Sequence, residues 1–210
     1  MGKQGKVSTL ILAATLMCGT AQAGKFEKPA MGTASATAYA NTLPPIGYVD
    51  FCGRDEDECK FSGGKVEKLS LTTEIWDQIQ QVNRYTNTTI RPTTDIAQYG
   101  VMDYWTYAVD AGDCEDFVLL KKRYLSQLGV PANELLITVV LDEKNEGHAV
   151  LTIPTDKGDY ILDNRRAEIL RWDQTGYTYL KRQSQPQANQ WVSLQNGPTT
   201  ASPLVATSAK

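Results

Sequence analysis

The feature that most constrains the fold is a helical pattern followed directly by three short β-type runs, all within residues 112–163. Apolar residues recur at helical spacing after Asp113, and Gly129 and Pro131 end that pattern. Three apolar, partly β-branched runs then alternate with polar turns, at residues 135–141, 148–153 and 160–163. This order predicts an α+β fold in which a helix packs on an antiparallel sheet.

A second amphipathic helix is predicted over residues 73–84, where Ile75, Ile79 and Val82 recur at helical spacing. The N-terminal residues instead resemble an export signal, because Lys3 and Lys6 precede a short apolar run that ends before an Ala-x-Ala pattern. Met17 occupies the position where a lipoprotein signal needs a small residue, which argues against lipid attachment at Cys18. The predicted organisation is a signal peptide at 1–23, a flexible segment at 24–45, one domain at 46–196 and a flexible tail at 197–210.

Charge and composition exclude several classes of function. The 210 residues carry a formal charge of −3, and loss of residues 1–23, with two lysines and no acid, would bring it to −5. Such a balance gives no footprint for nucleic acid or an anionic membrane surface. No stretch approaches the roughly 20 apolar residues of a transmembrane helix, so we expect no membrane insertion of the mature chain. The single histidine, His148, excludes an HExxH zinc site.

Cysteine spacing predicts one disulfide and one free thiol. Outside the signal, Cys52 and Cys59 flank a short acidic loop, and Cys114 remains as an odd cysteine. We expect a Cys52–Cys59 disulfide, since exported proteins favour such bonds. Metal binding by the same loop is the alternative, but the loop lacks the further cysteines or histidines of a zinc site.

Cys114 begins the predicted helix at 114–128. Free backbone N–H groups and the helix dipole at such a position favour a thiolate, which would lower the pKa of the cysteine. The alternative is a buried, inert cysteine, although the acidic residues around Cys114 argue against an apolar pocket. Position alone leaves both interpretations open.

His148 and Asp163 are the candidate partners of this thiol. His148 begins the second strand, and pairing across the turn at 155–158 would bring it within a rung or two of Asp163. A carboxylate there could orient the imidazole. Alone, each residue also fits a structural role, as a strand-end histidine or as part of an Asp-Asn turn.

Taken together, these residues resemble the bacterial transglutaminase-like cysteine proteinases, whose best-known members are the LapG-type periplasmic proteases. The resemblance rests on Gly112 to Asp116, Lys121, His148 to Leu151 and Leu162 to Asn164, and extends from about Tyr48 to Trp191. Further matching positions are Cys52, Cys59, Asp95, Asp103 to Trp105, Gly176-Tyr177 and Arg182 to Ser184. Tyr107 departs from the family pattern, which favours proline there.

The resemblance implies a papain-like, transglutaminase-type core with Cys114 as nucleophile, His148 as general acid/base and Asp163 as orienting carboxylate. It also implies a Ca²⁺ cofactor held by the acids that flank the cysteine, at Asp113, Glu115 and Asp116. Three adjacent helical residues cannot all point the same way, so other oxygen ligands would have to contribute. Helix capping by acids without a metal is the alternative.

For biology, the resemblance implies a periplasmic endopeptidase whose protein substrate is a large surface adhesin. An inner-membrane receptor that senses cyclic di-GMP would be the inhibitory partner. The same triad could instead transfer an acyl group to an amine, as in a transglutaminase or amidase. A non-catalytic calcium-binding envelope module is the third alternative.

Overall fold

The computed structural model describes residues 1, 35–60 and 66–196, and all of the elements described lie in the unit formed by residues 31–210. The predicted signal peptide, the first part of the 24–45 segment and the 197–210 tail lie outside the described residues. Among the described residues, no helix combines the length and the apolar character needed to cross a membrane.

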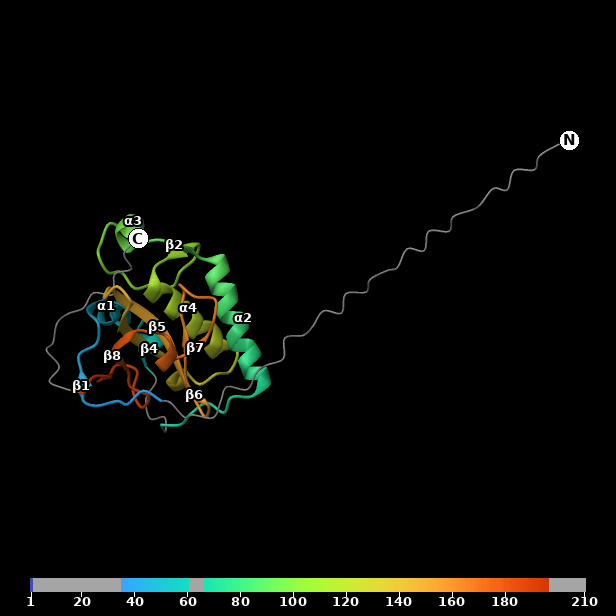
Figure 1. Ribbon diagram of the computed structural model, residues 1–210. Helices are drawn as coiled ribbons and strands as arrows, with labels where there is room; N and C mark the ends of the chain where they lie inside the picture. The colour runs from blue at the N-terminus through green and yellow to red at the C-terminus, as the bar shows by residue number, and fades with distance from the viewer. Residues whose placement is uncertain (2–34, 61–65, 197–210) are drawn as a thin grey trace. The chain divides into compact units, whose positions relative to one another are not determined.

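A seven-stranded antiparallel sheet is the centre of the fold, with strand order β1-β9-β8-β4-β5-β6-β7 (Figure 1). Its strands are β1 (Asn41–Thr42), β4 (Leu136–Leu141), β5 (Gly147–Thr155), β6 (Gly158–Leu162), β7 (Leu170–Arg171), β8 (Thr178–Gln183) and β9 (Trp191–Ser193). The strands β4, β5 and β6 confirm the meander predicted from the sequence. The pairing of β1 with β9 places residues 41–42 in the sheet, within a segment expected to be flexible, because a two-residue strand has no periodicity to detect.

The described residues also form four α-helices and three short 3₁₀ helices. They are α1 (Ile46–Arg54), α2 (Thr73–Thr89), α3 (Asp95–Tyr99) and α4 (Cys114–Gln127), with η1 (Glu56–Cys59), η2 (Ala132–Glu134) and η3 (Trp172–Gln174). The predicted helix at 73–84 is therefore confirmed and continues for another turn, since polar residues beyond Asn83 remain compatible with its exposed face. Helix α4 starts at Cys114, as the sequence indicates.

The main core lies between the sheet and the helices α2 and α4 (Figure 1). Alternate residues of β5, namely Ala149, Leu151 and Ile153, belong to this core, whereas Val150 belongs to a smaller cluster with Tyr179. The period of two along β5 is thus visible in the packing, and it separates the side chains of adjacent residues onto opposite faces. The helices and the antiparallel sheet confirm the expected α+β class.

The N-terminal helix α1 is joined to η1 by a disulfide and packs on the core through aromatic contacts. Cys52 and Cys59 form the predicted disulfide, with a Cα–Cα distance of 5.7 Å. Tyr48 packs edge-on against the rings of Trp105 and Trp191 at centroid distances of 5.8 and 5.4 Å. The free thiol among the described residues is Cys114, and it is buried.

A small parallel pairing positions the segment that leads into α4. β2 (Arg91–Pro92) pairs with β3 (Ala111–Gly112), so the chain before α3 lies beside the chain before α4. The side chain of Thr94 then caps α3 by accepting from the Ala97 N–H, which fixes the first residue of that helix, Asp95. The segment that leads into α3 therefore lies next to the segment that leads into α4.

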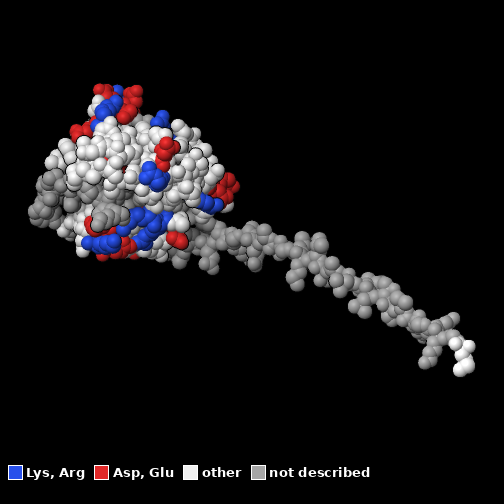
Figure 2. Space-filling model, turned by 90° about the horizontal axis from the view of Figure 1, so that it is seen from above, with Lys and Arg blue, Asp and Glu red and all other residues white. Residues whose placement is uncertain are grey.

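Surface charge is dispersed on the face seen from above, over the end of the fold where α3 and β2 lie. Figure 2 shows acidic and basic side chains in separate groups on this face, the largest of them rich in Lys and Arg along its lower side, with uncharged surface between the groups. Four acids, Asp95, Asp113, Glu115 and Asp116, are buried and add little to the surface charge.

Candidate active site

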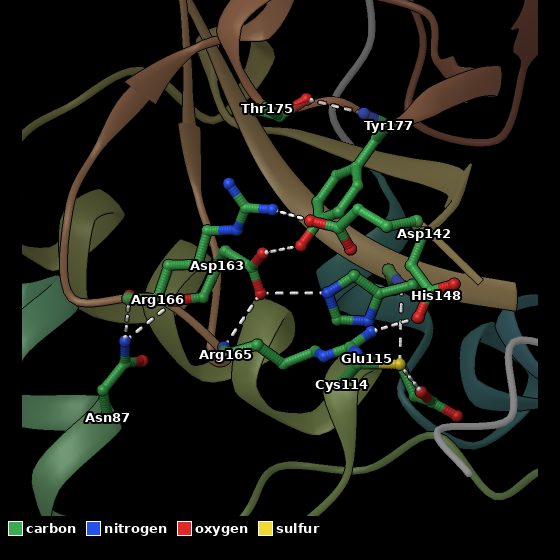
Figure 3. A network of polar contacts seen from close by, with 12 residues as sticks. Asn87, Cys114, Glu115, Asp142, His148, Asp163, Arg165, Arg166, Thr175 and Tyr177 are labelled. Carbon is green, nitrogen blue, oxygen red and sulfur yellow. Dashed lines mark hydrogen bonds and ion pairs between the residues drawn. The ribbon is translucent and has the colours of Figure 1, made fainter. Parts of the chain in front are cut away.

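Cys114 lies at the first position of α4, next to the start of β5. Its Sγ accepts a hydrogen bond from the Ala149 N–H at 3.4 Å and donates to Oε2 of Glu115 at 2.9 Å. The Ala149 contact joins the helix to the strand immediately after His148, so the fold brings these two sequence-predicted residues together (Figure 3).

His148 is completely buried and contacts the predicted carboxylate. Its Nε2 lies 2.9 Å from Oδ1 of Asp163. The strand pairing Leu151↔Leu162 explains the contact, because Asp163 directly follows the last paired residue of β6. An ionised carboxylate can only accept, so Nε2 carries the hydrogen, and in the neutral imidazole Nδ1 then keeps its lone pair. This Nδ1 has no hydrogen-bond partner among the described residues.

Asp163 accepts hydrogen bonds from two further donors besides His148. The hydroxyl of Tyr177 donates to Oδ2 at 2.6 Å, and the backbone N–H of Arg165 donates to Oδ1 at 2.9 Å (Figure 3). Burial alone would raise the pKa of Asp163, but the contacts with His148, Tyr177 and Arg165 outweigh it and lower the pKa to about 2. The carboxylate is therefore charged at neutral pH and stabilises a protonated imidazole.

Tyr177 is a residue of this site to which reasoning from the sequence assigned no role. Besides its bond to Asp163, its ring meets the ring of His148 edge-on at 5.8 Å, and the guanidinium of Arg166 lies over it at 4.9 Å. It comes from the loop before β8, far along the chain from the meander. The resemblance included Gly176-Tyr177, which was the one signal that could have pointed to it.

The thiol differs from expectation in its acidity. The start of a helix should lower the pKa of Cys114, yet complete burial raises that pKa well above its ordinary value. The neighbouring acids Glu115 and Asp113 raise it further, because negative charge opposes a thiolate. The lower pKa expected from the helix position is therefore not found, and Cys114 lies buried in the main core, contrary to the argument against an apolar pocket.

The three acids expected to bind metal lie in a larger buried group. Asp113, Glu115 and Asp116 each have one buried carboxylate oxygen without a hydrogen-bond partner among the described residues. Ligand atoms of Asp95, Asp113 and Asp116 lie within 4.8 Å of one another, and so do those of Asp95, Asp103 and Glu115. The three adjacent acids do not form one set by themselves. We refer to these five residues as the acidic cluster.

Asp95 and Asp103 are the members that the sequence did not identify as ligands. Asp95 accepts from the Tyr104 N–H, while Asp103 accepts from the indole N–H of Trp105 at 2.8 Å and the Gly47 N–H at 3.1 Å. Both acids lie in the segment that the β2–β3 pairing brings beside the start of α4.

Burial makes the charge of the acidic cluster costly. It is the main cause that raises the pKa of Asp113 to about 7 and that of Asp116 to about 8, with neighbouring acids adding to both. It also raises the pKa of Glu115 well above its ordinary value. Orphaned carboxylate oxygens in such a group fit a hard divalent cation such as Ca²⁺, which prefers six to eight oxygen ligands. Capping of α4 alone does not explain Asp95 and Asp103, and Asp113 makes no side-chain cap hydrogen bond.

A thiol at a helix start beside a histidine that contacts an aspartate is the arrangement of papain-like cysteine peptidases. Residues 38–199 match the family of bacterial transglutaminase-like cysteine proteinases, and the chain belongs to that family of cysteine peptidases.

Solved structures show a similar fold. Calcium-bound LapG of Legionella pneumophila is 23% identical, with a TM-score of 0.50, over 75% of this chain and 83% of that chain. Two further structures, LapG and EGTA-treated LapG from the same organism, are each 25% identical with a TM-score of 0.46. They cover 65% of this chain and 74% and 72% of theirs. Comparison with curated proteins gave no match.

Proposed function

We propose that this protein is a calcium-dependent cysteine endopeptidase in which Cys114 attacks the peptide, His148 moves the proton and Asp163 orients His148. One observation carries the proposal. Nε2 of His148 contacts Asp163, Nδ1 of His148 has no hydrogen-bond partner among the described residues, and the N–H of the following residue, Ala149, donates to the Cys114 thiol. The membership of the chain in a cysteine peptidase family supports the same roles.

The chemistry follows from these positions. Nδ1 of His148 takes the thiol proton, and the Cys114 thiolate attacks the peptide carbonyl carbon. His148 then gives the proton to the leaving amine, so that the C–N bond breaks and an acyl-thioester remains. Water, deprotonated by His148, attacks the thioester and restores the thiol. The N–H groups in the first turn of α4 supply a donor for the oxyanion, because they have no partner within the helix.

Calcium would be held by Asp95, Asp103, Asp113, Glu115 and Asp116. The orphaned oxygens of Asp113, Glu115 and Asp116, the burial of all but the half-buried Asp103, and the mutual spacing of the five acids support this assignment. When bound, the ion supplies positive charge that stabilises these carboxylates in their ionised form. The binding of calcium by a protein of similar fold agrees with it.

Location and substrate extend the proposal. The signal-like N-terminus supports a periplasmic enzyme, and the LapG-type resemblance favours a large surface adhesin as substrate, with a cyclic-di-GMP receptor in the inner membrane as inhibitor. The adhesin should leave the cell surface when the protein is produced. Equal surface adhesin with and without the protein would reject this substrate.

The central test is the rate at which iodoacetamide alkylates Cys114, measured against pH with calcium and with chelator. We expect His148-dependent labelling well below the ordinary thiol pKa of about 8.5 when calcium is present. His148→Ala should abolish that labelling, and Asp77→Asn, a change of an exposed acid on α2, should preserve it. An ordinary thiol profile in all proteins and conditions would reject the proposed triad.

Peptide assays distinguish hydrolysis from acyl transfer. Cleavage products without amine incorporation are expected, and they should vanish in Cys114→Ala. Incorporation of an amine into a glutamine peptide, without cleavage of any peptide, would reject the endopeptidase and favour a transglutaminase.

A further inference from the structure

Two consecutive arginines in the loop after β6 form ion pairs that the proposed mechanism does not use. Nη1 of Arg165 lies 2.6 Å from Oδ2 of Asp142 (Figure 3). Nη2 of Arg166 contacts Oε1 of the next acid, Glu143. Both acids lie in the turn that follows β4. The loop follows the proposed orienting carboxylate and the turn leads into the proposed general acid/base, so these ion pairs join the two segments that form the candidate site.

The inner pair, Arg165 with Asp142, is built around a buried carboxylate. The Asp142 side chain is completely shielded from solvent, although Arg165 reaches the surface. Oδ1 of Asp142 accepts from the backbone N–H of Lys144 at 2.8 Å and from that of Glu146 at 2.9 Å. One oxygen of this carboxylate therefore closes the turn before His148, and the other oxygen binds Arg165.

Arg165 also contacts the proposed triad through its backbone. Its N–H donates to Oδ1 of Asp163 at 2.9 Å, and Nε2 of His148 lies 2.9 Å from the same oxygen. Nδ2 of Asn87 on α2 holds the loop from the other direction, by donating to the backbone oxygens of Asp163 at 2.8 Å and Arg166 at 3.0 Å (Figure 3). Arg165 is thus the residue that contacts both the orienting carboxylate and the turn that leads into the imidazole.

The outer pair, Arg166 with Glu143, differs from the inner pair in its exposure. Its side chains are 26% and 49% exposed, compared with 0% for Asp142. Exposed ion pairs contribute little, because water screens the charges and long side chains lose entropy when they are held. A buried carboxylate that loses its cation instead remains uncompensated. The inner pair is therefore the one that can fix the two segments against each other.

We propose that Arg165 and Asp142 are positioning residues that keep the proposed orienting carboxylate on Nε2 of His148. This inference rests on the proposed triad, because it assigns the pair a role only through the contact between His148 and Asp163. It predicts that loss of the inner pair weakens this contact and slows the reaction of Cys114, whereas loss of the outer pair does neither.

Two neighbouring acid-to-amide changes provide a matched test. Asp142→Asn keeps an Oδ1 that can accept from the turn, but its amide N–H groups cannot pair with a guanidinium, which is also a donor. Alkylation of Cys114 at neutral pH, with calcium, should become about tenfold slower, because a small displacement of a supporting residue can reduce a rate by up to ~100-fold. Glu143→Gln is the control and should react like the wild type, since it changes only the exposed outer pair.

Changes of Arg165 test the other half of the pair. Arg165→Met should slow alkylation as much as Asp142→Asn does, and Arg165→Lys should recover most of the rate because it keeps a positive charge. The double variant with Asp142→Asn and Arg165→Met should be no slower than either single variant, because residues that act as one pair do not have additive effects.

The single histidine of the sequence makes its contact with Asp163 directly measurable. In the protein without an affinity tag, the imidazole ¹H–¹⁵N signals belong to His148. Burial and the contact with Asp163 should protect its Nε2 proton from exchange with water. This exchange should become about tenfold faster in Asp142→Asn and in Arg165→Met, and should stay unchanged in Glu143→Gln.

The outcomes separate this inference from the proposed function. Wild-type alkylation that does not depend on His148 would reject the triad itself. Alkylation that depends on His148, with wild-type rates of alkylation and exchange in Asp142→Asn, would overturn only the role of the ion pair. A lower thermal midpoint with unchanged exchange of the Nε2 proton would show a merely structural ion pair, and equal effects in Glu143→Gln would also contradict the proposal. Asp142→Asn retains the acceptor of the turn, so it keeps the test decisive if Arg165→Met does not fold.

Discussion

The acidic cluster should make the calcium-free protein lose stability as pH rises. In the folded protein, Asp113 and Asp116 have pKa values of about 7 and about 8, mainly because they are buried. In the unfolded chain both return to an ordinary value near 4. The unfolded chain therefore loses these protons first, and the stability present below about pH 4 is lost as pH rises to about 8.

The size of this loss follows from the difference between the two states. One pKa unit corresponds to about 1.4 kcal/mol, so Asp113 would contribute about 4 kcal/mol and Asp116 about 6 kcal/mol. The two acids repel each other, so these figures overlap and do not add. A loss of about 4 kcal/mol or more is a large part of the roughly 5–15 kcal/mol that stabilises a typical domain.

Urea unfolding followed by tryptophan fluorescence measures this directly at pH 5 and pH 8. With chelator, the free energy of unfolding should fall by several kcal/mol between the two values. Calcium should restore it at pH 8, by about 2.7 kcal/mol when its concentration is 100 times the dissociation constant.

Two variants provide the controls for this measurement. Asp116→Asn should flatten the pH dependence and weaken the effect of calcium, whereas Asp77→Asn should behave like the wild type because Asp77 is exposed. Equal stability at pH 5 and pH 8 in chelator, with no effect of calcium, would refute the reasoning for the whole cluster.

Three further changes test separate parts of the structure. Tyr177→Phe removes a hydrogen bond to a charged Asp163, so we expect a loss of about 1.5–3 kcal/mol in urea unfolding and slower alkylation of Cys114. Replacing Cys52 and Cys59 by serine should cost about 2.5 kcal/mol for this short loop while leaving the alkylation rate at 25 °C unchanged. Gly47→Ala should weaken the stabilisation by calcium, because a Cβ at this position would lie 2.6 Å from an oxygen of the Asp103 carboxylate. The shift of the thermal midpoint on addition of calcium measures this effect.

The central helix and the meander could be predicted because each has a clear local period and clear end signals. Gly129 has a positive φ of 95°, which glycine adopts readily at the end of a helix, and the sequence places it there. The same local signals predicted the contact between His148 and Asp163, since a hairpin fixes which residues lie opposite one another. The strand β9 escaped prediction because it covers only three residues. The strand β8 escaped prediction because it joins the sheet through β4, which is distant in the chain.

The acidic cluster was only partly predictable, for a different reason. Asp113, Glu115 and Asp116 stand together in the sequence, whereas Asp95 and Asp103 join them only through the β2–β3 pairing. That pairing covers two residues on each side and carries no periodic signal. The resemblance had included both positions, but without a role as ligands.

The acidity of Cys114 could not be predicted from its helix position, because burial and neighbouring acids act in the opposite direction. In this structure the thiol donates to Oε2 of Glu115, whereas Nδ1 of His148 has no hydrogen-bond partner among the described residues. The proposed mechanism requires the proton to pass to His148. Positive charge that engages the carboxylate of Glu115 would remove the competing acceptor and reverse its unfavourable effect on a thiolate. In the proposed mechanism, Glu115 would suppress the thiol without calcium and permit its activation with calcium, so a single group of residues would link cation binding to the reactivity of Cys114.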